Sequence, residues 1–173
     1  MNTPILTIPN PKLREISDEV VSFDKSLEDL INNLIDTLDA QIDPPGLGLS
    51  APQLGVLKRV FVAKIRNKPK AFVNPKIIKF SKKEIAFLEG CFSVPDIYGH
   101  VIRPAEIDLE SQDRQGKSRK EHYKGIAARI IQHELDHLNG TLFVDHVHTQ
   151  GGKVFKIKKV KGGHEHLEEV ALV

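Results

Sequence analysis

The sequence His133-Glu134-Leu135-Asp136-His137 constrains the fold of this chain more than any other segment. It lies in a stretch from about Gly125 to Asn139 whose apolar residues would surround a helix on most sides, and Gly140 is suited to end that helix. A helix of this kind belongs in the core, where two imidazoles and a carboxylate are costly to bury without a compensating partner. The segment therefore predicts a central, buried helix with a chemical role.

Residues four apart share a face of a helix, so His133 and His137 can bind one metal ion. Glu134 projects close to the same face, where a carboxylate can take a proton from water on the metal. Two hydrogen-bonded core histidines beside a charged residue are the alternative. We favour the metal site, because the rest of the helix is apolar.

A catalytic site of this type needs a third protein ligand. In the metzincin pattern HExxHxxGxxH the third histidine would stand at Phe143, so that pattern is incomplete. Carboxylates further along the chain are alternatives, at Glu165, Glu168 and Glu169. We favour Cys91, whose thiolate binds transition metals strongly and whose neighbour Gly90 allows close backbone approach. A lone cysteine can also be a small buried hydrophobic residue.

A third segment, Gly46–Gly55, combines glycines and small residues with an amide donor at Gln53. Taken alone, this loop indicates only a turn that leads into the next strand.

The remaining pattern indicates an α+β fold, with antiparallel or mixed sheets packed around the central helix. An amphipathic helix is expected over about Ser26–Ala40, with Ser26 and Asp29 resembling a capping box. Runs rich in Val, Ile and Phe predict strands at Arg59–Ile65, Ala71–Phe80, Glu84–Leu88 and Val101–Ser111.

Length and composition predict one soluble domain, which with its motifs we assign as catalytic over residues 1–148, followed by a basic strand or tail over 149–173. Lys153–Lys161 contains five lysines, which we interpret as keeping an edge strand soluble. A net charge of +2 gives little reason to expect binding to DNA, and we find neither a signal peptide nor an apolar run that could span a membrane. The single cysteine favours a reducing compartment, the cytoplasm or alternatively an organelle.

The three segments together resemble the peptide deformylase family. That family has a GxGLAAPQ loop, an EGCLS segment and a late HExDH helix, which correspond here to Gly46–Gln53, Glu89–Ser93 and His133–His137. The resemblance covers roughly residues 3 to 148. Two departures are Ser50 in place of the first alanine of the loop and Phe92 in place of the leucine after the cysteine.

The resemblance implies removal of the formyl group from the formyl-methionine of newly made polypeptides. Cys91, His133 and His137 would hold one divalent ion, most often iron(II) in this family, with zinc, nickel or cobalt able to replace it. Glu134 would carry the proton. The oxyanion would be stabilised by the side chain of Gln53 and the backbone N–H of Phe92.

The resemblance also implies where the substrate lies. The peptide would extend along the Gly46–Gly48 loop, with Gly48 and Gly90 at the site. The methionine side chain would enter an apolar pocket formed by Leu47, Ile126, Arg129 and Ile130. Partners would be formyl-methionyl nascent peptides and, as an alternative role for the lysine segment, the ribosome.

Two rival interpretations remain from the residues alone. A zinc endopeptidase would use the same HExxH helix without Cys91. A structural metal module would close the site with a fourth ligand, His146 or His148, on a segment that we expect to be extended.

Overall fold

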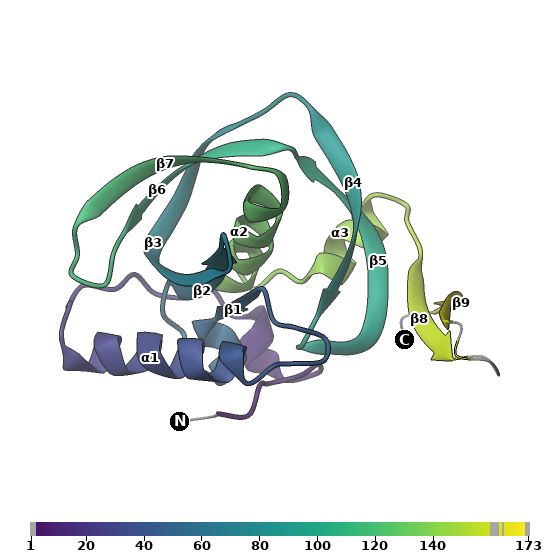
Figure 1. The fold of residues 1–173 in the computed structure, drawn as a ribbon, viewed down its shortest axis with the longest axis horizontal. Helices are drawn as coiled ribbons and strands as arrows, with labels where there is room; N and C mark the ends of the chain where they lie inside the picture. Colours follow the sequence, from purple (N-terminus) through teal and green to yellow (C-terminus); the bar gives the residue numbers. More distant parts are fainter. Residues whose placement is uncertain (1–2, 160–162, 164, 172–173) are drawn as a thin grey trace.

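The computed structural model describes residues 3–159, 163 and 165–171. Its strands form two antiparallel sheets, and three α-helices pack against them, which confirms the expected α+β class. Figure 1 shows helix α2 in the middle of the molecule, with the five-stranded sheet on one side and β4 and β5 on the other. Among the described residues, no helix is long and apolar enough to cross a membrane.

The five-stranded sheet has the strand order β1-β2-β3-β6-β7. Its strands are β1 (Gly48–Ser50), β2 (Val60–Ile65), β3 (Lys68–Phe80), β6 (Glu106–Gln112) and β7 (Ser118–Lys124). One face packs against α2 (Gly125–Leu138) through a core that includes the stacked rings of Phe61 and Phe72. The sheet thus supports α2 along its length.

The second sheet has the order β4-β5-β8-β9. Its strands are β4 (Glu84–Cys91), β5 (Val94–Pro104), β8 (Val154–Lys159) and β9 (Glu165–Val170). Helix α3 (Phe143–Thr149) covers its inner face, where Val101, Phe143 and Val147 are almost fully buried. The strand pair β4–β5 lies beside α2, because Arg129 bonds to the carbonyls of Ile85 and Val101, and Cys91 at the end of β4 comes close to His137.

Helix α1 (Lys25–Asp39) packs on β1 and β2 through a stripe that includes Leu27, Ile31 and Leu34. The residue that caps it is Asp24, whose side chain accepts a hydrogen bond from the backbone N–H of Leu27. The helix therefore lies within one residue of the expected range, but the expected capping box at Ser26 and Asp29 was wrong. The short 3₁₀ helices η1 (Pro11–Arg14) and η2 (Ala51–Leu54) complete the fold.

The strand expected over Val101–Ser111 is two strands, β5 and β6, which belong to different sheets. The chain passes from one sheet to the other at Ala105, whose N–H bonds to the carbonyl of Lys83. Alternating apolar residues continue on both sides of this point, so periodicity alone did not reveal the break.

Three further expectations concern the C-terminal part. His146 and His148 lie on α3 and not on an extended segment, because Phe143, Val144 and Val147 place an apolar helical stripe against β5. The lysine segment forms β8, but β8 pairs with both β5 and β9 and is not an edge strand. Val160 and Lys161 lie outside the described residues.

Candidate metal centre and active site

Three potential metal ligands converge from two elements. Helix α2 supplies His133 and His137, one turn apart, and Cys91 is the last residue of β4. Their ligand atoms all lie within 4.8 Å of one another, and Cys91 Sγ is 3.3 Å from His137 Nε2. A thiolate and two imidazoles at this separation suit a tetrahedral transition-metal site with one open position. The three residues therefore fit a bound divalent ion.

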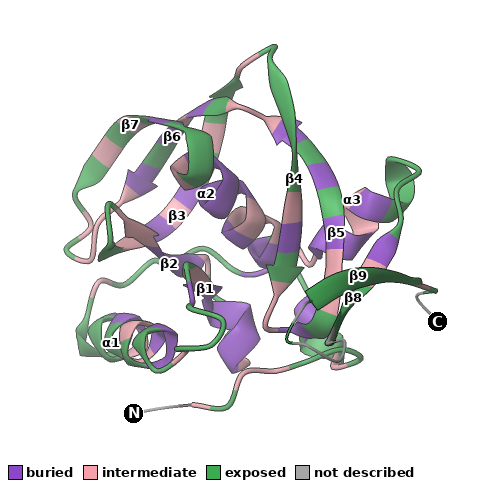
Figure 2. Ribbon diagram, turned by 45° about the vertical axis from the view of Figure 1, so that its right-hand side comes forward, coloured by how far each residue is buried: buried purple, intermediate pink, exposed green. Residues whose placement is uncertain are grey.

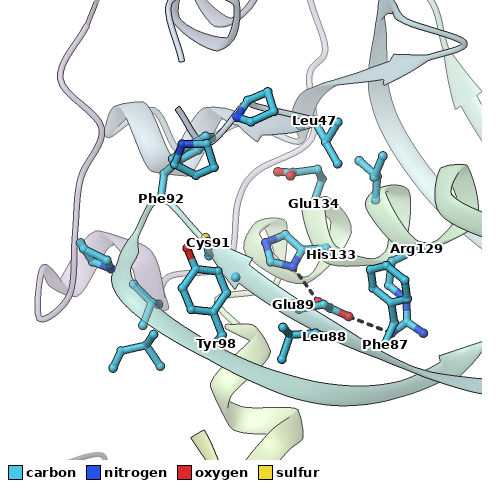
Figure 3. A pocket seen from close by; sticks show the side chains of 18 of the residues that line it. Leu47, Phe87, Leu88, Glu89, Cys91, Phe92, Tyr98, Arg129, His133 and Glu134 are labelled. Carbon is cyan, nitrogen blue, oxygen red and sulfur yellow. Dashed lines mark hydrogen bonds and ion pairs between the residues drawn. The ribbon is translucent and has the colours of Figure 1, made fainter. Parts of the chain in front are cut away.

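His133 is oriented by a buried carboxylate. Its Nδ1 is 2.8 Å from Glu89 Oε1, which leaves Nε2 as the nitrogen that faces the ligand group (Figure 3). Burial alone would raise the pKa of Glu89, but hydrogen bonds from His133 and Arg103 hold the pKa of this carboxyl far below its usual value. Glu89 is therefore an anion that fixes the ring of His133.

Two buried arginines hold Glu89 in place. Arg103 donates to both of its oxygens, from Nε at 2.7 Å and from Nη2 at 2.9 Å, and Arg129 donates from Nη1 at 2.8 Å. Arg103 also reaches Asp136 Oδ2 at 2.7 Å, and the same oxygen is 2.9 Å from His146 Nε2. The candidate ligand His133 is thus held in position by a network of buried charges.

Our reading of the sequence missed this network. Glu89 belongs to the EGC segment and Asp136 to the HExDH segment, so both were visible, but no short-range pattern pairs either with Arg103. The charges come together only because β4, β5 and α2 meet. The one available signal was that Arg103 stands in the same alternation as the apolar residues Val101, Ile107 and Leu109.

Glu134 is buried beside the ligands. Burial raises the pKa of its carboxyl to about 7, and its Oε2 has no hydrogen-bond partner among the described residues. The backbone of Gly48 comes so close that a Cβ there would lie 2.5 Å from Glu134 Oε1. A carboxylate with a free oxygen and a raised pKa is suited to exchange protons with water.

Gln53 lies in η2, opposite Cys91. Its Oε1 accepts hydrogen bonds from the backbone N–H of Ser50 at 2.9 Å and from the Ser50 hydroxyl at 3.0 Å. These bonds turn the amide nitrogen toward Ser93 Oγ at 3.1 Å and Cys91 Sγ at 3.5 Å. The donor end of the side chain therefore faces the ligand group.

A cavity of about 380 Å³ opens onto these groups. The expected residues Leu47, Gly48, Gly90 and Ile130 all line it, as do Gln53, Phe92, Ile126, Arg129, His133 and Glu134. Figure 3 shows Leu47, Phe87 and Tyr98 around the same space. Arg129 contributes mainly through its bonds to Glu89 and to the carbonyls of Val101 and Ile85.

The alternative ligands do not join the group. Within the described ranges, the cluster contains Cys91, His133 and His137, and neither His146 nor His148 belongs to it. The downstream glutamates lie on β9, where Glu168 and Glu169 form ion pairs with Lys158 and Lys153. Among the described residues, Cys91, His133 and His137 are therefore the candidate ligands.

Comparisons with known proteins show which family the chain is similar to. Residues 2–153 match the family model described as polypeptide deformylase. A peptide deformylase of Rhizobium meliloti (strain 1021) is 39% identical over 149 residues, covering 83% of this chain and 84% of that protein. A peptide deformylase of Zymomonas mobilis is 40% identical over 153 residues, covering 83% and 85%.

Solved structures are similar over the same region. The crystal structure of a peptide deformylase from Legionella pneumophila superimposes with a TM-score of 0.79 at 40% identity, covering 84% of this chain and 86% of that one. A probable peptide deformylase from synechococcus phage S-SSM7 gives a TM-score of 0.78 at 41% identity. In that comparison 84% of this chain covers 99% of the phage chain.

Proposed function

The chain belongs to the peptide deformylase family, and from this premise we propose which of its residues perform the reaction. It is a hydrolase that removes the N-terminal formyl group from newly made polypeptides. The observation that carries the residue assignment is the group of Cys91, His133 and His137 beside the buried carboxylate of Glu134.

We propose Cys91, His133 and His137 as the ligands of one divalent ion, iron(II) by preference, with zinc, nickel or cobalt as substitutes. When bound, such an ion supplies Lewis acidity, which lowers the pKa of water and polarises the formyl oxygen. Glu89 keeps the ring of His133 in the required tautomer and orientation.

The preference for iron can be tested by exposure to air. Iron(II) is oxidisable and lies beside a thiolate, so the iron form should lose activity faster than the nickel form. Equal half-lives of the two forms in air would contradict the assignment of iron.

Glu134 moves the proton in this scheme. Its carboxylate accepts the proton from the attacking water and delivers it to the amine that leaves when the C–N bond breaks. The raised pKa supports this role, because a group that titrates near neutrality can both accept and return a proton.

Gln53 and Phe92 stabilise the oxyanion. The amide nitrogen of Gln53 faces the ligand group, and the backbone N–H of Phe92 follows directly after Cys91. A donor of this kind contributes about 2.7–4 kcal/mol to lowering the barrier.

The cavity binds the N-terminal methionine. Leu47, Ile126 and Ile130 offer apolar surface to its side chain, with Gly48 and Gly90 next to the peptide backbone. The main chain of Gly48–Ser50 is at the end of the five-stranded sheet, so an extended peptide can add to it as a further strand.

The domain assignment follows from this scheme. Helix α2, with the HExxH motif, is the catalytic element, and the amphipathic helix α1 supports β1 and β2 from behind. Residues 1–148 form the catalytic unit and residues 149–173 an extension. The cytoplasm, or an organelle, is the compartment in which formylated nascent chains occur.

Ribosome docking through the lysine segment is a weaker proposal. Lys153 and Lys158 already form ion pairs with Glu169 and Glu168, which reduces their attraction to RNA phosphates. Co-sedimentation with ribosomes at low salt would test it, by comparing the intact chain with one whose five lysines are replaced by glutamine. Equal binding of both would exclude this segment.

The function is tested by measuring formate release from formyl-Met-Ala by protein purified anaerobically with iron(II). Formate is expected, together with free Met-Ala. A zinc endopeptidase would instead cut internal peptide bonds of an unformylated peptide and release no formate.

A further inference from the structure

We propose that the outer face of the ribbon β8–β9 binds the part of the formylated nascent chain that follows the residues held in the cavity. This inference rests on the proposed function. The surface consists of Tyr98, Phe155, Ile157 and Leu167, and we call it the outer strip.

The outer strip begins at the cavity. Tyr98 lines the cavity, and its ring packs so closely over Gly90 that a Cβ on Gly90 would lie 2.6 Å from Tyr98 Cε1. In the sheet Tyr98 pairs with Gly90 on one side and with Phe155 of β8 on the other. Directly paired residues share a face, so Phe155 extends the surface of Tyr98 away from the cavity.

The strip continues across the ribbon. Ile157 lies two residues beyond Phe155, on the same face of β8, and pairs with Leu167 of β9. Their side chains are 41% and 40% exposed. Figure 1 shows the ribbon projecting from the body of the molecule on the side of β5, and Figure 2 shows β9 exposed along most of its length.

The opposite face of the ribbon packs against the body of the protein. Val154 is buried in the cluster beneath α3, and Val170 packs against the same cluster. The ribbon is therefore held to the body by its inner face, and its apolar residues on the outer face have no such role.

The ribbon lies outside the family match. The family match ends at residue 153, just before β8 begins, and the phage structure is matched over 99% of its length by 84% of this chain. The ribbon thus lies beyond the residues that the family model matches, and a role in binding more of the substrate is compatible with its position.

A second copy of this chain is a poorer occupant. The ribbon carries exposed ion pairs, Lys158–Glu168 and Lys153–Glu169, and an edge-to-edge contact with a second copy would have to desolvate these charged groups. A nascent chain, in contrast, must leave the cavity in some direction, and the strip offers it apolar contacts that are continuous with the lining.

The distance from the cavity to the outer strip determines how long a peptide must be to contact the strip. β9 lies two strand spacings from β5, about 10 Å, which an extended chain crosses with about three residues. A peptide that ends within the cavity cannot reach Ile157 and Leu167. A peptide of about ten residues can reach both.

The test compares the double variant Ile157→Thr/Leu167→Thr with the unaltered, metal-loaded enzyme. Threonine keeps the strand propensity while removing apolar surface. The control is Lys156→Thr, on the opposite face of the same strand. The substrates are formyl-Met-Ala and a formylated peptide of about ten residues with apolar side chains in its second half, and the readout is kcat/KM.

We expect the double variant to lose roughly tenfold in kcat/KM on the long peptide, by loss of two apolar contacts, and to match the unaltered enzyme on formyl-Met-Ala. The control should behave as the unaltered enzyme on both. Equal values for the double variant and the unaltered enzyme on the long peptide would overturn the proposal. An equal loss on both substrates would overturn it too, because it would indicate general damage.

Two further outcomes distinguish failure of this proposal from failure of the proposed function. Sedimentation that shows dimers of the unaltered enzyme and monomers of the double variant would assign the strip to a second copy and overturn the proposal. Absence of formate release from formyl-Met-Ala by the unaltered enzyme would instead refute the proposed function.

Discussion

Replacing Glu89 by glutamine tests the buried charge network most directly. The carboxylate is 6% exposed and accepts hydrogen bonds from Arg103 and Arg129, while its Oε1 lies 2.8 Å from His133 Nδ1. Glutamine keeps the size of the side chain but removes the charge. Both guanidinium groups then remain in the core; Arg103 keeps its ion pair with Asp136, whereas Arg129 keeps only its bonds to the carbonyls of Val101 and Ile85.

Removing one partner of a buried ion pair costs about 3–5 kcal/mol. In a chain of 173 residues, 1 kcal/mol lowers the melting temperature by about 2–4 °C, so a fall of about 6–20 °C is expected. Chemical denaturation of metal-free protein measures this loss without a contribution from metal binding. The loss should persist in high salt, because buried charges are poorly screened.

The pH dependence has a definite sign. The pKa of Glu89 is held below that of the unfolded chain, so its stabilisation is fully present above about pH 4.3 and is lost as the pH falls toward the folded value. The difference in stability between the unaltered protein and Glu89→Gln should therefore stay constant near neutrality and shrink in acid.

Glu121→Gln is the matched control. Glu121 also pairs with a cation, Lys70 Nζ at 2.5 Å, but its side chain is 31% exposed, so its loss should cost no more than about 1 kcal/mol. In addition, Glu89→Gln should weaken metal binding about 10–100-fold, since His133 loses its anionic partner. A destabilisation by Glu89→Gln no larger than that of the control would refute the reasoning.

Three other predictions concern single groups. Glu134→Ala should retain the metal and lose turnover, because the substitution removes the proton carrier and no metal ligand. Metal content and reaction rate are measured on the same sample, and appreciable activity of the metal-loaded variant would contradict the assignment. Cys91→Ser should weaken metal binding itself. Unchanged metal stoichiometry and activity in this variant would show that Cys91 is a small hydrophobic residue and not a metal ligand. Hydrogen bonding to Asp108 raises the pKa of His122 above its ordinary 6.5, so its stabilisation is present below that pH and lost as the pH rises through the raised value. NMR titration should show this raised pKa and a fall in Asp108→Asn, whereas an unchanged pKa would remove the pairing with Asp108 as its cause.

Several features of this protein could be predicted from short stretches of sequence. The spacing of His133 and His137 and the apolar residues around them indicated one helix with two ligands on one face. Cys91 was named as the third ligand from its neighbours and from the incomplete histidine pair. The structure brings these three residues together, and their role as metal ligands stays a prediction. Such patterns can be recognised because the periodicity of a helix and the chemistry of a ligand are expressed within a few residues.

Other features depended on contacts between distant segments. The binding of Glu89 by Arg103 and Arg129 spans 14 and 40 residues, and no local pattern predicts which buried charges will meet. Sheet assembly likewise determines that β5 and β6 belong to different sheets. It also determines that β8 pairs with both β5 and β9. Local propensity limits what each segment can form, whereas packing of the whole chain selects its partners, because burial is gained only when the segments come together.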